Sequence, residues 1–154
     1  PVSMWKKILV AVDGSDPSLH ALEVAAGMAA QNKAELTVLS VVPPLPPIME
    51  GDMPPYAPKF TADLTESYEN MVNAKAEEVR VKHKDLNVVP IVMTGSPSRT
   101  IIEASRARGS DLIVLGNRGT SGILSWVLGS VSRQVTDACT VPLLVIKDQT
   151  YCET

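Results

Sequence analysis

The chain has 154 residues, 45% of them hydrophobic and 20% charged, so we expect a single globular domain over residues 1–154 with an ordinary buried core. The formal net charge is −3 and no run of like charges occurs, which argues against nucleic acid or an anionic membrane as the main partner. Cys139 and Cys152 have neither metal-ligand spacing nor the pattern of a disulfide framework, so we expect a reduced, cytoplasmic protein with no metal site of its own.

The start of the chain predicts a strand, a turn and a helix. Residues 7–12 are an apolar run typical of a buried strand, and Asp13-Gly14-Ser15 follows as a turn. Asp16 is predicted to be the N-cap of a helix whose first residue is Pro17. No apolar stretch reaches the roughly 18 residues of a membrane-spanning helix, and no signal-peptide pattern opens the chain. Residues 1–3 are expected to be additions ahead of a natural start at Met4.

The middle of the chain predicts two further strands around a long helix. Residues 36–42 predict the second strand, and residues 43–60 predict a loop because they hold seven of the twelve prolines. A helix is predicted over residues 63–84, with Asp63 and Glu66 in capping-box spacing. Residues 88–93 predict the third strand, whose Pro90 suggests a position at the edge of a sheet.

The last part of the chain continues the alternation. Ser96-Pro97 is expected to open a helix that Gly109 closes, and residues 112–115 predict a fourth strand. A helix is predicted over residues 130–138 and a fifth strand over residues 141–146.

Five apolar strands alternating with four helices predict an α/β fold with an open, parallel, doubly wound sheet of the Rossmann-like type. Ligands of such sheets bind beyond the carboxyl ends of the strands, where the strand order reverses. The unusual residues of this chain follow strand ends, at residues 13–15, 95–96 and 116–130.

The segment Gly116-x2-Gly119-x9-Gly129-Ser130 has the composition that a phosphate site needs. It joins the apolar run 111–115 to the predicted helix that starts at Ser130. Glycine lets the backbone approach an anion closely, and a helix N-terminus offers unpaired N–H groups and a positive dipole end. The sequence contains neither a P-loop motif nor a Gly-x-Gly-x-x-Gly fingerprint, so a P-loop NTPase or a dinucleotide-binding domain is disfavoured.

This glycine pattern resembles the signature of the ATP-binding branch of the universal stress protein family. The resemblance extends from residues 7–15 to residues 141–145 and so covers nearly the whole chain. It implies a fold similar to that of the adenine-nucleotide α-hydrolases, with strand order 3-2-1-4-5. It also implies ATP as ligand, with Mg²⁺ or Mn²⁺ carried by the phosphates.

The resemblance also implies which residues contact the nucleotide. Residues after the first strand would line adenine and ribose, one backbone position on the second strand would reach the adenine edge, and the glycine segment would hold the ribose and phosphates. The implied contacts are Ala11, Val12, Asp13, Val41, Gly95, Leu115, Gly116, Arg118, Gly119, Gly129, Ser130, Val131 and Ser132.

Structural roles compete with several of these assignments. Asp13 alternatively caps the turn into the first helix, and Gly95 alternatively serves only a strand-to-helix turn. Ser130 and Ser132 fit ordinary helix caps, and Arg118 fits a solvated loop charge.

Three functions are compatible with the sequence. The first is an ATP-binding regulatory module of the stress response with at most slow hydrolysis, because no activated nucleophile and no paired carboxylates are visible. The second is an enzyme of the same fold that adenylates its substrate or hydrolyses ATP, although Asp13-Gly14-Ser15-Asp16 replaces the loop typical of adenylating relatives. The third is an interaction protein that needs no nucleotide. The resemblance further implies a homodimer paired through strand 141–146, with a downstream protein partner that the sequence leaves open.

Overall fold

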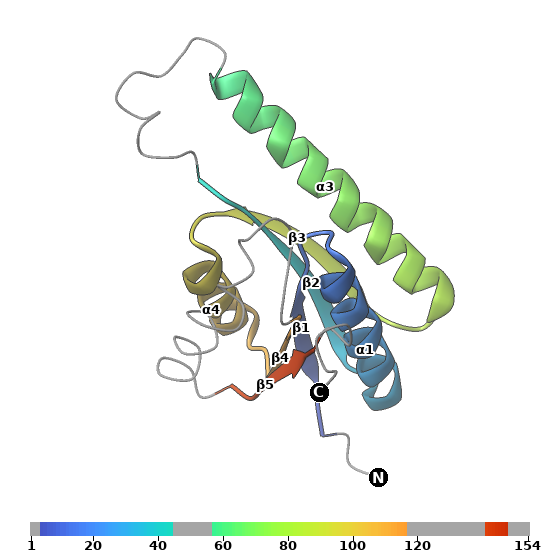
Figure 1. Cartoon of the computed structure of the whole chain (residues 1–154). Helices are drawn as coiled ribbons and strands as arrows, with labels where there is room; N and C mark the ends of the chain where they lie inside the picture. Colours follow the sequence, from blue (N-terminus) through green and yellow to red (C-terminus); the bar gives the residue numbers. More distant parts are fainter. Residues whose placement is uncertain (1–3, 45–56, 117–140, 148–154) are drawn as a thin grey trace, which may run out of the picture.

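The computed structural model describes residues 4–44, 57–116 and 141–147 (Figure 1). Five strands form one parallel sheet in the order β3-β2-β1-β4-β5, which confirms the predicted fold class and strand order. The strands are β1 (Lys7–Ala11), β2 (Glu35–Val42), β3 (Val88–Thr94), β4 (Leu112–Gly116) and β5 (Leu143–Ile146).

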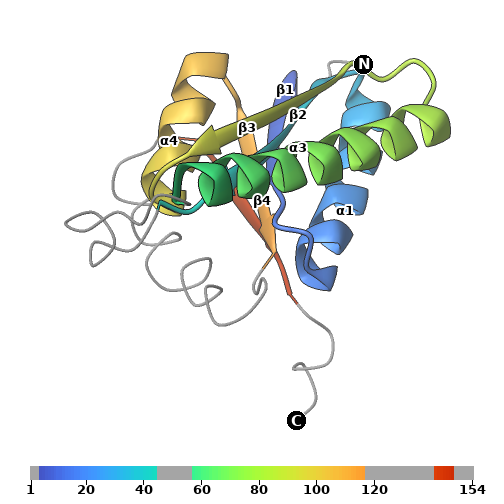
Figure 2. The same ribbon diagram turned by 90° about the horizontal axis from the view of Figure 1, so that it is seen from above.

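Helices cover both faces of the sheet. The described helices are α1 (Asp16–Asn32), α3 (Ala57–Lys82) and α4 (Pro97–Arg108). Figures 1 and 2 show α1 and α3 on one face and α4 on the other. The helix predicted over residues 130–138 lies outside the described residues. In the described part of the chain, none of the helices is both long enough and apolar enough to cross a membrane.

Two hydrophobic cores follow from the alternation of side chains along the strands. On β1, Ile8 and Val10 pack with α1 and α3, whereas Leu9 and Ala11 pack on the α4 side. Because both faces of a central parallel strand are buried, its sequence is continuously apolar, as the prediction assumed. The central strands of the sheet are therefore buried on both faces.

The start of α1 differs by one residue from the prediction. Ser15, not Asp16, is the N-cap: its backbone is extended, and its side-chain oxygen accepts a hydrogen bond from the Ser18 amide at 3.4 Å. Asp16 and Pro17 occupy the first helical positions, where Pro17 needs no amide partner and the Asp16 carboxylate lies near the positive end of the helix dipole.

The long helix α3 begins at Ala57, six residues before the predicted start at Asp63. Residues 57–60, which were predicted to be the end of the proline-rich loop, therefore belong to α3. Pro58 is compatible with the helix because the first turn leaves its amides without intrahelical partners. Asp63 and Glu66 consequently lie within the helix and do not form the predicted capping box. The helix ends at Lys82, two residues before the predicted Lys84.

The edges of the sheet are β3 and β5. The edge position predicted for Pro90 is confirmed, since among the described strands β3 has a neighbour on one side only. On the other edge, β5 starts at Leu143 rather than Val141. Pro142 has no amide hydrogen to donate, although its carbonyl accepts a hydrogen bond from the Ile113 amide at 3.0 Å.

The helix opened by Ser96-Pro97 is α4, and Gly109 closes it as predicted. Gly109 has φ of +67°, and its amide donates back to carbonyl oxygens of the last turn. The turn that precedes α4 begins at Gly95, directly after β3.

Candidate functional site

The strand order reverses between β1 and β4. The chain passes outward from β1 through β2 to β3, and α4 then carries it back to β4 on the other side of β1. In an open parallel sheet the crevice at such a reversal, beyond the carboxyl ends of the strands, is the usual place for a ligand. Asp13 follows β1 and Gly116 ends β4, so both lie at this reversal.

Asp13 is half-buried and participates in the turn between β1 and α1. Its Oδ1 accepts hydrogen bonds from the Ser15 amide at 3.0 Å and from the Ser15 hydroxyl at 2.6 Å. Its own amide donates to the Ser18 hydroxyl oxygen at 3.2 Å. Asp13 therefore has the turn role that sequence reasoning offered as the alternative. A carboxylate has about four lone-pair sites, so this role is compatible with a ligand contact as well.

The backbone next to Asp13 is held by β2. The Val12 amide donates to the Leu39 carbonyl at 2.8 Å, and the hydroxyl of the fully buried Ser40 donates to the Val12 carbonyl. The side chains of Ala11 and Val12 are buried. A ligand could therefore contact mainly the backbone of these two residues. The hydrogen bonds to β2 hold the Val12 backbone in place.

Gly116 is required by close packing against α1. A Cβ atom at this position would lie 2.8 Å from the carbonyl oxygen of Pro17 and 2.9 Å from its carbonyl carbon. Real Cβ atoms do not approach backbone so closely, so only glycine lets the end of β4 meet the first turn of α1. This contact holds the end of β4 against the first turn of α1.

Gly95 serves the turn between β3 and α4. Its φ is +153°, which side chains rarely adopt, and a Cβ atom would lie 2.7 Å from the Thr100 hydroxyl oxygen. Its amide donates to the Val42 carbonyl at 3.1 Å. The turn role offered for Gly95 is therefore present, and its role toward a ligand stays a prediction.

The structure brings one group of predicted site residues together. Ala11, Val12 and Asp13 lie beside Leu115 and Gly116, because β1 and β4 are hydrogen-bonded neighbours.

The other predicted site residues are farther from this reversal or outside the described parts of the chain. Val41 is half-buried on β2, and Gly95 follows β3 one strand farther out. Arg118, Gly119 and residues 129–132 lie outside the described residues, so their roles stay predictions.

Sequence reasoning missed the serines and the tyrosine around Asp13. Ser15 and Ser18 fix the turn, and Ser40 reaches across from β2. Tyr68 of α3 interacts electrostatically with Asp13: burial raises the pKa of its phenol, and the negative charge of Asp13 raises it further. Ser40 could have been noticed in the sequence, because a serine within an apolar strand is unusual. Tyr68 could not, because its position near Asp13 depends on how α3 packs along the sheet.

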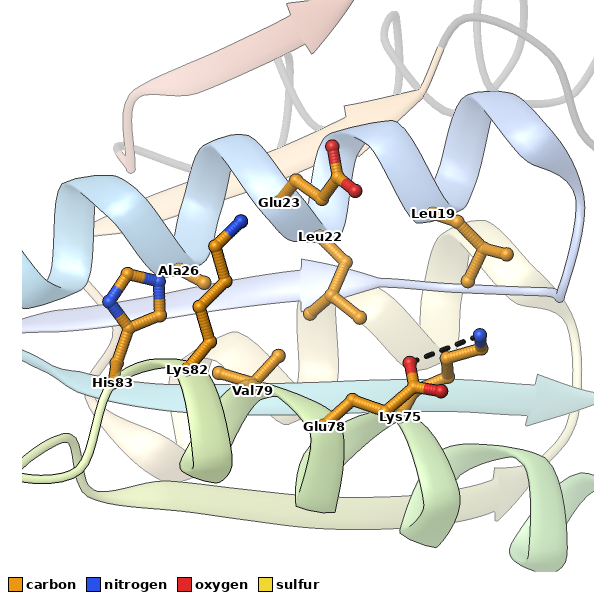
Figure 3. A pocket seen from close by; sticks show the side chains of 9 residues that line it. All are labelled: Leu19, Leu22, Glu23, Ala26, Lys75, Glu78, Val79, Lys82 and His83. Atoms are coloured by element: carbon orange, nitrogen blue, oxygen red, sulfur yellow. Dashed lines mark hydrogen bonds and ion pairs between the residues drawn. The ribbon is translucent and has the colours of Figure 1, made fainter.

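A separate cavity of about 220 Å³ lies between α1 and α3 (Figure 3). Apolar side chains that include Leu22, Ala26 and Val79 line it, and charged residues lie around it. Lys75 and Glu78 form an ion pair at 3.2 Å along one side. Within the residues that the structure describes, no group of three His, Cys, Asp or Glu side chains is arranged to hold a metal ion.

Residues 4–147 match the universal stress protein family, which is nearly the whole chain. The chain belongs to this family. A relative from Bacillus subtilis, universal stress protein YxiE, is 33% identical over 153 residues, covering 94% of this chain and all of the relative. A universal stress protein from Methanocaldococcus jannaschii is 32% identical and covers 94% of this chain and 84% of its own length.

Solved structures of universal stress proteins share this fold. UspA from Lactobacillus plantarum superposes with a TM-score of 0.76 at 26% identity, covering 92% of this chain and 97% of its own. A family member from Burkholderia pseudomallei gives 0.70 at 28% identity, with 95% and 98% covered. A universal stress protein in complex with cAMP gives 0.65 at 25% identity, with 94% and 98% covered.

Proposed function

We propose that this universal stress protein binds ATP at the carboxyl edge of β1 and β4 and acts as a nucleotide-responsive regulatory module with at most slow hydrolysis. The observation that carries the proposal is the arrangement at the strand reversal: the Asp13 carboxylate follows β1 directly, and the side-chain-free Gly116 lies at the end of the neighbouring β4. A similar protein of this family has been solved with cAMP, an adenine nucleotide, which supports the choice of ligand class.

The residues present fit a nucleotide in chemical terms. The half-buried carboxylate of Asp13 is suited to accept hydrogen bonds from ribose hydroxyls, and the backbone of Ala11, Val12 and Gly116 is suited to line the base and sugar. We propose that Arg118, Gly119 and residues 129–132 hold the phosphates, as the glycine spacing indicates. Mg²⁺ or Mn²⁺ would be carried by the phosphates and would neutralise part of their charge.

Calorimetry with ATP and Mg²⁺ tests the proposal. We expect a dissociation constant in the micromolar range or tighter, which corresponds to about −8 kcal/mol at 1 μM. AMP and cAMP titrated in parallel show which part of the nucleotide supplies the affinity. Absence of both binding heat and thermal stabilisation at millimolar ATP would refute it.

Gly129→Val tests the phosphate role of the glycine segment. A branched side chain at this position blocks close backbone approach to a phosphate, so we expect ATP binding to be lost while circular dichroism stays that of the wild type. Ser130→Ala should be milder, at about 1.5–3 kcal/mol, because it removes one hydrogen bond to a charged group. Normal ATP affinity in Gly129→Val would show that the phosphates bind elsewhere.

A further inference from the structure

The register of α3 against β3 places Tyr68 near the carboxyl edge of the sheet, where we propose that the nucleotide binds. Figure 1 shows α3 running antiparallel to β2, and Arg80 near its end donates to the Val88 carbonyl at 2.8 Å, at the start of β3. The six residue steps of β3 rise ~20 Å. A helix covers that rise in ~13 residues. Counting back from Arg80, α3 reaches the carboxyl end of the sheet near residue 67, and its first ten or so residues extend beyond it.

A second contact places α3 independently. Met71 Cγ lies 4.0 Å from the position that a Cβ atom of Gly14 would occupy, so α3 passes directly over the turn after β1. Val72 is 1% exposed and belongs to the core on this face of the sheet. Tyr68 is one helical turn before Met71 and Val72, toward the carboxyl edge, and the charge of Asp13 acts on its phenol.

The environment of Tyr68 differs from that of an ordinary surface tyrosine. Its side chain is half-buried, and both burial and the charge of Asp13 disfavour its ionisation. Like an ordinary tyrosine, Tyr68 is protonated at neutral pH, and its hydroxyl can donate a hydrogen bond. Because Ser15 already holds Oδ1 of Asp13, a second donor would restrict the rotation of this carboxylate further.

We propose that Tyr68 is a positioning residue of the nucleotide site: its ring forms the wall next to Asp13, and its hydroxyl orients the Asp13 carboxylate toward the 2′,3′-diol of a ribonucleotide. The inference rests on the proposed function. It adds α3 to the elements that form the proposed site, whereas the glycine signature involves only residues 116–130. It predicts that Tyr68 contributes to discrimination between nucleotides by their sugar.

The test compares ATP with 2′,3′-dideoxy-ATP in wild type and in Tyr68→Phe, by calorimetry with Mg²⁺. Phenylalanine keeps the ring and removes only the hydroxyl. We expect ATP to bind about tenfold more weakly, which is about 1.4 kcal/mol, and dideoxy-ATP to be unaffected within about twofold. In an Asp13→Asn background Tyr68→Phe should change neither affinity further. Thr65→Val is the matched control, because it removes a hydroxyl one turn away that donates to the Thr61 carbonyl at 2.9 Å.

The possible outcomes separate this inference from the proposed function. If the wild type binds ATP and Tyr68→Phe retains the preference for ATP over dideoxy-ATP, the role of Tyr68 is wrong and the ATP site stands. If the wild type binds neither nucleotide, both are wrong. A third measurement needs no nucleotide: ¹³C NMR of labelled tyrosine should show a lower pKa for Tyr68 in Asp13→Asn than in wild type. An unchanged pKa would overturn the placement of Tyr68 beside Asp13.

Discussion

Single residues at the strand reversal between β1 and β4 have structural roles beside their proposed ligand roles. Gly116 was predicted to contact a phosphate because it begins the glycine pattern. The structure shows another reason for glycine at this position, since β4 approaches the backbone of Pro17 too closely for a side chain. Asp13 was predicted as a ligand contact, and its Oδ1 is used by the turn. The packing therefore supplies a structural reason for Gly116 and Asp13, and their contact with a ligand stays a prediction.

Gly116→Ala should destabilise the fold. The added Cβ would lie 2.8 Å from a backbone oxygen, and neither β4 nor α1 can move without disturbing the buried core around them. We expect a loss of roughly 1–3 kcal/mol in the free energy of unfolding, as for other overpacked interiors, measured by urea denaturation.

Gly27→Ala is the matched control for Gly116→Ala. Gly27 lies within α1, and a Cβ atom there would meet nothing within 4 Å. Because alanine is the better helix former, this variant should gain roughly 0.5–1 kcal/mol. Equal effects of the two substitutions would contradict the steric account of Gly116.

The raised pKa of Tyr68 makes stability depend on alkaline pH. The folded state binds the phenolic proton more tightly than the unfolded chain does, so its contribution is fully present below the pKa of the unfolded tyrosine, near 10. It is lost as the pH rises through the higher pKa of the folded state. Urea denaturation between pH 9 and 11.5 should therefore show a steeper decline in wild type than in Tyr68→Phe. Parallel declines would contradict the pKa shift.

At the scale of elements, apolar periodicity together with glycine and proline at the boundaries predicted every described strand and helix. The errors are in the residues at which the elements begin and end. Gly109 marks the end of α4 because a left-handed residue is needed there, and the prediction was right. Pro58 misled the prediction of α3, because proline breaks a helix interior but is tolerated in a first turn. The local sequence does not say where that first turn begins, since packing of α3 on the sheet decides it.

Ser15→Ala tests the corrected N-cap of α1. The Ser15 side chain accepts from the Ser18 amide and donates to Asp13, so its removal should cost about 1 kcal/mol in the free energy of unfolding. Asp16→Ala removes a helical residue near the positive dipole end and should cost less, about 0.3–1 kcal/mol. Chemical denaturation of both variants distinguishes the two assignments, since a larger loss for Asp16→Ala would restore Asp16 as the cap.

At the scale of the whole molecule, strand order came from the family resemblance and not from local pattern. Apolar runs predict buried strands but do not say which strand lies beside which. The exception was Pro90, which indicated an edge and is found on β3. The reversal between β1 and β4 follows from the strand order, so the place where a ligand is expected could be predicted as soon as that order was assumed. The role that we propose for α3 could not be predicted from the sequence, because it depends on where that helix lies along the sheet.

The second edge strand, β5, is where we propose that two copies of the chain pair as a homodimer. Its four residues are apolar and half-exposed, and its outer edge has no neighbour among the described strands. An apolar strand edge without charges promotes pairing with another chain, and two antiparallel copies would form a self-complementary two-fold contact.

The choice of substitution in β5 matters. Leu144 packs partly against the core shared with α1, so a charge at Leu144 would disturb folding as well as assembly. Val145 packs in neither described core cluster and is the cleaner position. Val145→Lys should convert the dimer to a monomer whose circular dichroism is unchanged, as measured by light scattering at matched concentrations.

Val89→Lys provides the control for Val145→Lys. Val89 is also a half-exposed valine outside both core clusters, but it lies on β3 at the opposite edge of the sheet. If assembly occurs through β5, Val89→Lys stays dimeric, because the added charge is far from the paired edge. A monomeric wild type at high micromolar concentration would refute the dimer altogether. Dissociation by Val89→Lys together with a persistent Val145→Lys dimer would instead place the interface at β3, where Pro90 leaves one fewer backbone donor for pairing.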